Sequence, residues 1–408
     1  MKQSFPEFLR VRQVLDTPTL TDIPAAVAAE LDSLHLPLVG RRIAVTAGSR
    51  GIANIAQITR CIVDYVKSHG GTPFIVPAMG SHGGATAEGQ REVLRHYGIS
   101  EKTMDCPVEA TMETVLLGYT ENGAPVHFDK AAYESDGIIV CNRVKPHTDF
   151  VAPNESGVVK MVAIGLGNET GCTAIHAHGL AESIPLSCAL SLEKAPILCG
   201  LGIVENSRDE TCLIRAIPKE RFLETDAELQ TLSRKLAPSL PTDQLDLLVV
   251  KEIGKIYSGT GMDTKVIGRI RIDGVAEPER PHIRYIAALR MNEQSYGNAL
   301  GIGLADITTK ALVEQIDQRM MYPNLLATTY LERGKIPIYF DTEEESIESA
   351  LKLCGSGEPK IAVIENTLHM KTLLVSEAVY EAEKDRLEIL ERNVELKFDE
   401  SGCLIDGD

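Results

Sequence analysis

The stretch 145–180 collects side chains that can bind metals, exchange protons or form covalent bonds. It contains three histidines, His147, His176 and His178, and it places Lys160 inside the apolar run GVVKMVAIGLG. A structural loop has no need for these groups together. Their concentration in about a tenth of the chain predicts a functional site.

Two histidines in separate loops have the properties of an acid/base pair. His82 lies between glycines in MGSHGGAT, and His147 follows a proline in RVKPHTD. Imidazole exchanges protons near neutral pH, so the two could serve opposite faces of one carbon, as a racemase requires. The alternative for each is an exposed turn residue, and His82 could instead cap the following helix.

Lys160 and the HxH pair suggest covalent and metal chemistry. A lysine among apolar residues is easily neutralised and can become a covalent attachment point. Alternatively its side chain reaches out to water or pairs with Glu155. His176 or His178 could bind nickel, copper, iron or zinc through a neutral imidazole. At least one of these two histidines must then be structural.

Two glycine-rich loops later in the chain offer cations for an anionic substrate. The loop EIGKIYSGTGMDTKVIGR, residues 252–269, lacks the GxxxxGK[ST] order of a phosphate loop. We expect it to bring Lys255, Lys265 or Arg269 to a carboxylate, which a planar guanidinium matches in bidentate fashion. The loop SYGNALGIGLADITTK ends in Lys310, where a plain surface loop before a helix is an equal alternative.

The composition limits the class of protein. The 408 residues are 44% hydrophobic and 24% charged, which is typical of soluble proteins. The chain has no apolar run of eighteen residues and no secretion signal, so a cytoplasmic protein is expected. The net charge of −17 argues against nucleic acid or anionic membranes as partners. The nine cysteines form no CxxC pair, which argues against a zinc cage or a disulfide framework. The oligomeric state stays open.

The hydrophobic pattern predicts a parallel α/β sheet in the first half of the chain. Three segments share an apolar strand that ends in a polar or glycine-rich loop: 41–70, 71–99 and 135–147. Ligands of such sheets bind beyond the carboxyl ends of the strands. Arg50, His82 and His147 each follow a strand of this kind, so we expect them to face one crevice.

A second domain is predicted after the proline-containing segment 236–244. The later elements are expected as strands, a helix and a hairpin: strands within 245–270, 284–291, 335–340 and 360–366, a helix at 376–392 and a hairpin at 394–405. We predict two α/β domains with mostly parallel sheets and an active-site cleft between them. Their bounds are 1–241 and 242–385, with the segment from about 386 to 408 packing back on the first domain.

Several of these motifs, taken in order, resemble the nickel-dependent lactate racemase family, part of a superfamily of 2-hydroxyacid racemases and epimerases that use a nickel-pincer nucleotide. The matching positions follow the family order along the chain: Ser49-Arg50, Gly80-Ser81-His82, Pro146-His147, Ser156-Gly157-Val158-Val159-Lys160 and His176. His176 lies sixteen residues after Lys160, which is the family spacing.

The resemblance implies a cofactor and its ligands. The cofactor would be nickel pyridinium-3,5-bisthiocarboxylic acid mononucleotide, made by separate biosynthesis proteins and bound to Lys160 through a thioamide. Ser49, Arg50 and Gly157 would also contact it. His176, or alternatively His178, would be the nickel ligand.

The resemblance also implies a mechanism. His82 and His147 would act as the acid/base pair while hydride passes from the α-carbon of a 2-hydroxy acid to the cofactor and back. Arg50, Arg269 and Lys310 would bind the anionic substrate. Arg269 would replace a lysine in the family's Tyr-Gln-x-x-Lys motif. Because this motif departs from the family, we expect a dicarboxylic or sugar hydroxy acid rather than lactate.

Two other classes of protein remain open from the sequence. One is a zinc-type hydrolase or lyase that holds its metal with His82, His147 and His176. The other is a binding protein without a cofactor on the same two-domain fold. Clustered histidines with Lys160 favour the racemase over the binding protein, which would need none of them together.

Overall fold

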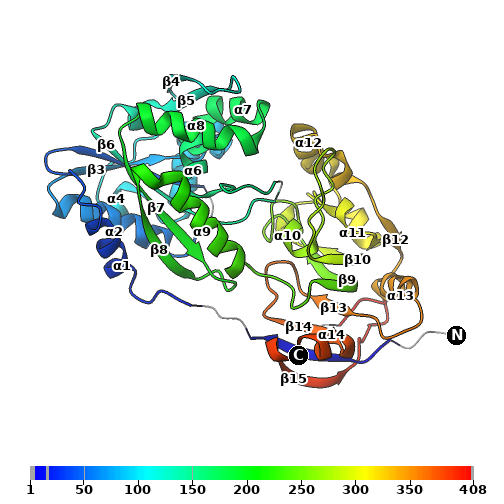
Figure 1. Cartoon of the computed structure of the whole chain (residues 1–408). Helices are drawn as coiled ribbons and strands as arrows, with labels where there is room; N and C mark the ends of the chain where they lie inside the picture. Colours follow the sequence, from blue (N-terminus) through cyan, green and yellow to red (C-terminus); the bar gives the residue numbers. More distant parts are fainter. Residues whose placement is uncertain (1–4, 15–17, 50, 149, 406–408) are drawn as a thin grey trace. The chain divides into compact units, whose positions relative to one another are not determined.

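The computed structural model describes residues 5–14, 18–49, 51–148 and 150–405, apart from the side chain of Ala327. The chain forms two compact units (Figure 1). Unit 1 comprises Met1–Asp16 and Pro238–Asp408, and unit 2 comprises Thr17–Ala237. The boundary between 237 and 238 falls inside the segment that the sequence marks as a linker.

Unit 2 is built on a five-stranded sheet in the order β3-β2-β6-β7-β8, in which only β8 is antiparallel to its neighbour. A separate antiparallel hairpin is formed by β4 and β5. The strands are β2 (Arg42–Ala47), β3 (Thr72–Pro77), β4 (Thr114–Tyr119), β5 (Pro125–Asp129), β6 (Gly137–Arg143), β7 (Ile197–Glu205) and β8 (Thr211–Pro218). The helices are α1 (Ile23–Asp32), α2 (Ile55–Ser68), α3 (Ala87–His96), α4 (Glu101–Met104), α5 (Lys130–Tyr133), α6 (Gly157–Lys160), α7 (Asn168–Ala177), α8 (Leu180–Lys194) and α9 (Phe222–Leu236), with short turns η1 (Gly83–Ala85), η2 (Met161–Gly165) and η3 (Lys219–Arg221).

Helices cover both faces of this sheet, because alternate strand residues point to opposite sides. Ala44 packs into a core with α6–α9 and the β4–β5 hairpin, whereas its neighbours Ile43 and Val45 pack against α1–α4. The two cores make unit 2 a three-layer α/β/α structure (Figure 1). The expected helical stripe on α2 is buried as predicted, from Ile55 to Val66.

Unit 1 holds an eight-stranded sheet in the order β12-β11-β10-β9-β13-β14-β1-β15. Neighbours from β12 to β13 are parallel and the remaining pairs are antiparallel. The strands are β1 (Phe8–Gln13), β9 (Gln244–Ile253), β10 (His282–Met291), β11 (Ile307–Thr309), β12 (Ile338–Phe340), β13 (Ile361–Ile364), β14 (Thr372–Ser376) and β15 (Leu387–Val394). The helices are α10 (Thr264–Ile267), α11 (Lys310–Glu314), α12 (Gln318–Thr328), α13 (Glu343–Cys354) and α14 (Glu377–Glu383), with turns η4 (Glu293–Ser295), η5 (Ile302–Leu304), η6 (Leu331–Gly334) and η7 (Lys384–Arg386).

The predicted α/β class with mostly parallel sheets is confirmed, and two details at the chain ends differ from expectation. The segment 376–392 is helical only as far as η7, and its second half is the strand β15. The segment after 386 does not pack back on the first domain: β15 pairs with β1 inside unit 1. The N-terminal strand therefore belongs to unit 1 and not to the predicted domain 1–241.

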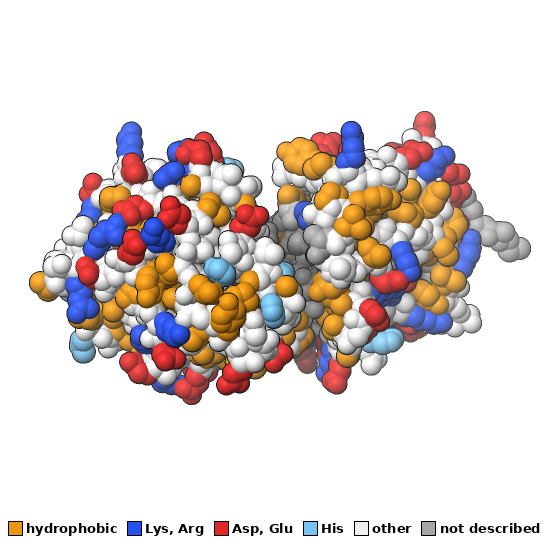
Figure 2. Space-filling model, turned by 90° about the horizontal axis from the view of Figure 1, so that it is seen from above, with side chains coloured by type: hydrophobic (Ala, Val, Ile, Leu, Met, Phe, Trp, Pro, Cys, Tyr) orange, Lys and Arg blue, Asp and Glu red, His pale blue; other side chains and the backbone are white. Residues whose placement is uncertain are grey.

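The face of each unit that Figure 2 shows carries mixed charges, with basic and acidic side chains interspersed. No helix among the described residues is both long and apolar enough to cross a membrane.

The position of β1 inside the sheet of unit 1 predicts a stability effect. Val11 is fully buried, with Leu373 of β14 on one side and Ile389 of β15 on the other. We expect Val11→Ala to lower the free energy of unfolding by about 2 kcal/mol, because two methyl groups leave a cavity. Val14→Ala, at a site 61% exposed, should change it by less than about 0.5 kcal/mol. Urea unfolding followed by circular dichroism measures both, and equal effects would contradict this position of β1.

Candidate active site

Three parallel neighbouring strands of unit 2 bring predicted site residues to one edge of the sheet. Ser49 follows β2, His82 follows β3, and His147 follows β6. The Ser49 hydroxyl oxygen Oγ is hydrogen-bonded to Nδ1 of His82, so these two loops meet. Arg50, the fourth residue expected at this edge, lies outside the described residues.

The segment that carries Lys160 lies beneath this edge. From Gly157 to Asn168 every residue is buried except Lys160, which is partly exposed. The segment contains α6, then the π-helical turn η2, and a π-turn inside a helix often marks a functional site. The N–H of Gly80, in the loop after β3, donates to the carbonyl of Gly165 at 3.1 Å. The lysine is thus presented from a rigid, otherwise buried support.

The start of α6 is fixed by a carboxylate from α9. Oδ1 of the buried Asp226 accepts a hydrogen bond from the N–H of Val158 at 2.9 Å. The carbonyl of Gly157 accepts one from Nδ2 of Asn142 at 2.8 Å. Gly157 has a φ of +77°, and a Cβ there would lie 2.1 Å from Oδ1 of Asp226. Only glycine fits this position without displacing the carboxylate.

Gly157 provides a direct test of this contact. Gly157→Ala should cost about 1–2 kcal/mol for the left-handed backbone, and a further 1–3 kcal/mol, roughly, for the collision with Asp226. Gly123→Ala is the matched control, because Gly123 has a φ of +85° with nothing within 4 Å of the added Cβ. Thermal or urea unfolding measures the loss of stability in both variants, and the difference between the two losses is the cost of the collision with Asp226. Equal losses of stability would mean that Asp226 does not contact Gly157.

The loop that carries His147 is pinned by another buried carboxylate. Glu155 accepts from the N–H of His147 at 2.6 Å and from the N–H of Ala152 at 3.1 Å. Its charge is balanced by Arg234 of α9, with Nη2 at 2.8 Å from Oε1. The His147 ring packs on Phe150 with centroids 4.6 Å apart. Backbone and ring of His147 are therefore both restrained.

His176 and His178 lie at the end of α7, and each ring is bonded to the helix backbone. Nδ1 of His176 is 2.7 Å from the carbonyl oxygen of Cys172, and Nδ1 of His178 is 2.8 Å from that of Ala174. A carbonyl only accepts, so Nδ1 carries the hydrogen and the Nε2 lone pair of each neutral ring is left for a metal.

Cys172 is a site residue that the sequence argument set aside. Its Sγ lies 3.7 Å from Nδ1 of His176 and 3.9 Å from Oγ of Ser81, next to His82. Burial raises the pKa of the Cys172 thiol, but the contacts with His176 and Ser81 outweigh it and bring the pKa below its ordinary value. The spacing of four residues from His176 on a helix was the signal in the sequence.

The electrostatics link Lys160 to His176. The hydrogen bond to Cys172 raises the pKa of His176 above its ordinary value, and the charge of Lys160 opposes this rise. The two side chains thus lie within electrostatic range of each other. Among the residues that the structure describes, no three His, Cys, Asp or Glu side chains form a group that could hold a metal by themselves.

The predicted substrate cations Arg269 and Lys310 lie in unit 1. The Arg269 guanidinium is mostly buried, pairs with Asp306 at 2.8 Å and donates to the carbonyls of Leu304, Ile283 and Arg284. Burial lowers its pKa from the ordinary value. This environment is that of a structural arginine. Lys310 is half exposed at the start of α11 and lies 3.4 Å from Asp341. Asp263 caps the start of α10, where its side chain accepts a hydrogen bond from the N–H of Lys265.

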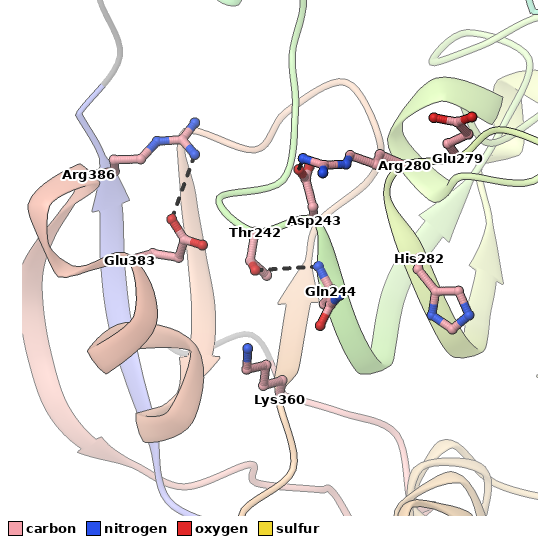
Figure 3. A pocket seen from close by; sticks show the side chains of 9 residues that line it. All are labelled: Thr242, Asp243, Gln244, Glu279, Arg280, His282, Lys360, Glu383 and Arg386. Atoms are coloured by element: carbon pink, nitrogen blue, oxygen red, sulfur yellow. Dashed lines mark hydrogen bonds and ion pairs between the residues drawn. The ribbon is translucent and has the colours of Figure 1, made fainter.

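Unit 1 also contains a polar cavity of about 330 Å³ at the amino ends of β9 and β10 (Figure 3). It is lined by acids and bases together: Thr242, Asp243, Gln244, Glu279, Arg280, His282, Lys360, Glu383 and Arg386. Asp243 pairs with Arg280 at 3.0 Å, and Glu383 lies 3.7 Å from Arg386. None of the predicted site residues lines it, and ligands of parallel sheets usually bind at the opposite, carboxyl ends.

Comparisons with known proteins agree with the motifs. Residues 42–184 match the family described as the lactate racemase N-terminal domain. A solved structure of the lactate racemase apoprotein from Thermoanaerobacterium thermosaccharolyticum has a similar fold, with a TM-score of 0.52 and 14% identity. The similarity covers 88% of this chain and 98% of that one. No curated protein matches the sequence.

The matched segment contains His82, His147, Lys160 and both candidate nickel ligands. Residues 42–184 match the lactate racemase N-terminal domain family, so the resemblance seen in the motifs is confirmed. The solved structure shows the same α/β fold. The family match supports a racemase-type activity on 2-hydroxy acids in general terms.

Proposed function

We propose that this protein is a racemase or epimerase of a 2-hydroxy acid that carries a nickel-pincer nucleotide on Lys160. When bound, this group supplies the centre that accepts hydride from the α-carbon and returns it. The observation that carries the proposal is the setting of Lys160. It is the single partly exposed position in a buried segment of twelve residues, from Gly157 to Asn168, inside the family-matched region.

The residues around Lys160 fit such a group. A covalent tether requires an amine that reaches the surface from a fixed backbone, which α6 provides. His176 suits the role of the nickel ligand, because its Nε2 carries the lone pair and Lys160 lies within electrostatic range. His178 also has an available Nε2 and stays the alternative. Ni(II) accepts imidazole readily.

The acid/base roles fall to His82 and His147. The contact with Ser49 uses Nδ1 of His82, so proton exchange with a substrate hydroxyl would take place at Nε2. His147 lies in the loop after β6, which is separated from β3 by β2 in the sheet. Its backbone is held by Glu155 and its ring packs on Phe150. Two imidazoles from separate strands can serve the two faces of one carbon.

Substrate capture is proposed for Arg50 and Lys310. Arg269 fits a structural role better, because Asp306 and three carbonyls occupy its guanidinium. A dicarboxylic or sugar hydroxy acid remains the proposed substrate class.

The zinc-type hydrolase or lyase is the less supported candidate. It needs three protein ligands for its metal, and no such group is present among the described residues. The proposed cofactor would need only one histidine from the protein, which His176 or His178 would provide.

The tether is tested by intact mass and nickel content after co-expression with the cofactor-making enzymes. The wild-type chain should carry a nickel-containing adduct, and Lys160→Ala should lose both the adduct and the nickel. Lys102→Ala, at an exposed lysine on α4, should keep both. His176→Ala should keep the adduct but hold nickel less well, and His178→Ala should keep both. An unmodified wild-type chain under conditions that load a known family member would refute the proposal.

The acid/base pair is tested on the loaded enzyme. His82→Ala and His147→Ala should each slow loss of optical purity of the hydroxy acid by roughly 10²–10⁴-fold, with adduct and nickel unchanged. His96→Ala, at an exposed histidine of α3, is the control and should leave the rate unchanged. Full activity in either of the first two variants would remove that histidine from the mechanism.

A further inference from the structure

The buried face of α9 is mostly polar. Of its six buried residues, four are polar: Thr225, Asp226, Gln230 and Ser233. Oγ1 of Thr225 and both amide atoms of Gln230 have no hydrogen-bond partner among the described residues. Each such group costs about 1–3 kcal/mol. A helix chosen only for packing would bury apolar residues here, so this face indicates an additional role.

Asp226 supplies that role through three hydrogen bonds. Oδ1 accepts from the N–H of Val158 at 2.9 Å and from that of Val159 at 3.5 Å, and Oδ2 accepts from Nδ2 of Asn154 at 3.0 Å. Val158 and Val159 form the first turn of α6, whose last residue is Lys160. The carboxylate therefore accepts hydrogen bonds from backbone N–H groups that have no partner within the helix. A negative charge is also favourable at the start of a helix.

The same helix holds the His147 loop. Arg234, two turns after Asp226, donates to the carbonyl of Ala152 at 2.6 Å and to Oε1 of Glu155 at 2.8 Å. Glu155 in turn binds the N–H of His147. One rigid helix thus fixes both the tether and one member of the acid/base pair.

We propose that Asp226 is a positioning residue whose charged carboxylate fixes the start of α6 and thereby the placement of the Lys160 amine. The inference rests on the proposed function, in which Lys160 carries the cofactor. Because α6 is only four residues long, a shift of its first turn reaches Lys160 directly.

The three hydrogen-bond partners of this carboxylate among the described residues are all donors. Nδ2 of Asn154 is kept toward Asp226 by a second hydrogen bond to the carbonyl of Leu223 at 3.0 Å, and Val158 and Val159 present N–H groups. Protonation of Asp226 removes the negative charge that strengthens all three hydrogen bonds. The contacts with Asn154, Val158 and Val159 are therefore weaker when the carboxyl is neutral.

This change falls in an accessible pH range. Burial raises the pKa of Asp226 from 3.8 to about 7, and the hydrogen bonds from Asn154 and the α6 amides oppose the rise. Burial raises the pKa of the Cys188 thiol of α8 well above the ordinary value, and the charge of Asp226 adds to this rise, so the thiol is uncharged near neutrality. The hydrogen bonds to the charged Asp226 carboxylate are therefore at full strength above about pH 7 and weaker below it.

As the pH falls, protonation of Asp226 weakens the start of α6 but increases the contribution of this residue to the free energy of unfolding. Between the unfolded pKa of 3.8 and the folded pKa of about 7, the folded chain binds the additional proton. The free energy of unfolding therefore gains from Asp226 as the pH falls through this window. The titration of Asp226 itself therefore opposes general unfolding in the pH range where α6 loosens.

The test uses hydrogen exchange and acylation of the full-length chain without cofactor. In Asp226→Asn the amides of Val158 and Val159 should exchange roughly 10–100-fold faster, since a charged hydrogen bond is lost. Acylation of Lys160 by acetic anhydride, normalised to Lys102 and read by peptide mass spectrometry, should change severalfold.

The pH dependence separates positioning from general stability. In the wild type, protection of Val158 should fall as the pH is lowered from about 8 to about 6, and in Asp226→Asn it should not depend on pH.

Gln230→Met is the matched control on the same buried face, one turn later, where the amide has no hydrogen-bond partner among the described residues. It should leave Val158 exchange and Lys160 acylation unchanged. If Asp226→Asn leaves both readings unchanged, or if Gln230→Met alters them equally, the positioning role is overturned. If the wild type never forms an adduct, the proposed function fails, while exchange and acylation still decide the role of Asp226.

Discussion

The hydrogen bonds from α6 to the buried Asp226 carboxylate are the contact on which the candidate site depends. A helix of four residues has no stability of its own, because its nucleation is costly. Here its first amides are satisfied by a residue 68 positions later in the chain, and its last turn runs into a π-turn packed under the loop after β3. Lys160 therefore has a defined place only when unit 2 is fully folded.

The sequence predicted the sheet edge better than the support beneath it. Alternation of strand and helix patterns is a local property, so the positions after β2, β3 and β6 could be identified, and the Ser49–His82 contact agrees with them. The importance of Asp226 could not be read in the same way. In FLETDAELQTLSRKL it resembles its exposed neighbours Glu224 and Glu228, and only the tertiary packing separates buried from solvated acids.

The prediction of a helix over residues 376–392 was wrong in its second half for a related reason. Glu, Leu and Arg in LEILER suit a helix by intrinsic preference, yet the segment forms β15 at the edge of the sheet of unit 1. Its partner β1 lies at the other end of the chain and supplies the pairing that decides the outcome. Charged residues are well tolerated on such an edge. Arg269 is a similar case, because its burial among carbonyls could not be seen from its glycine-rich loop.

The two candidate nickel ligands can be separated by helix geometry. Residues two apart on an α-helix point about 200° apart, so His176 and His178 cannot both face Lys160. Their Nδ1 contacts are equivalent, and these contacts do not distinguish them. The charge of Lys160, however, acts on the pKa of His176, and Sγ of Cys172 lies 3.7 Å from Nδ1 of that ring. His176 therefore combines a fixed ring orientation with proximity to Lys160, whereas His178 points to the other side of the helix.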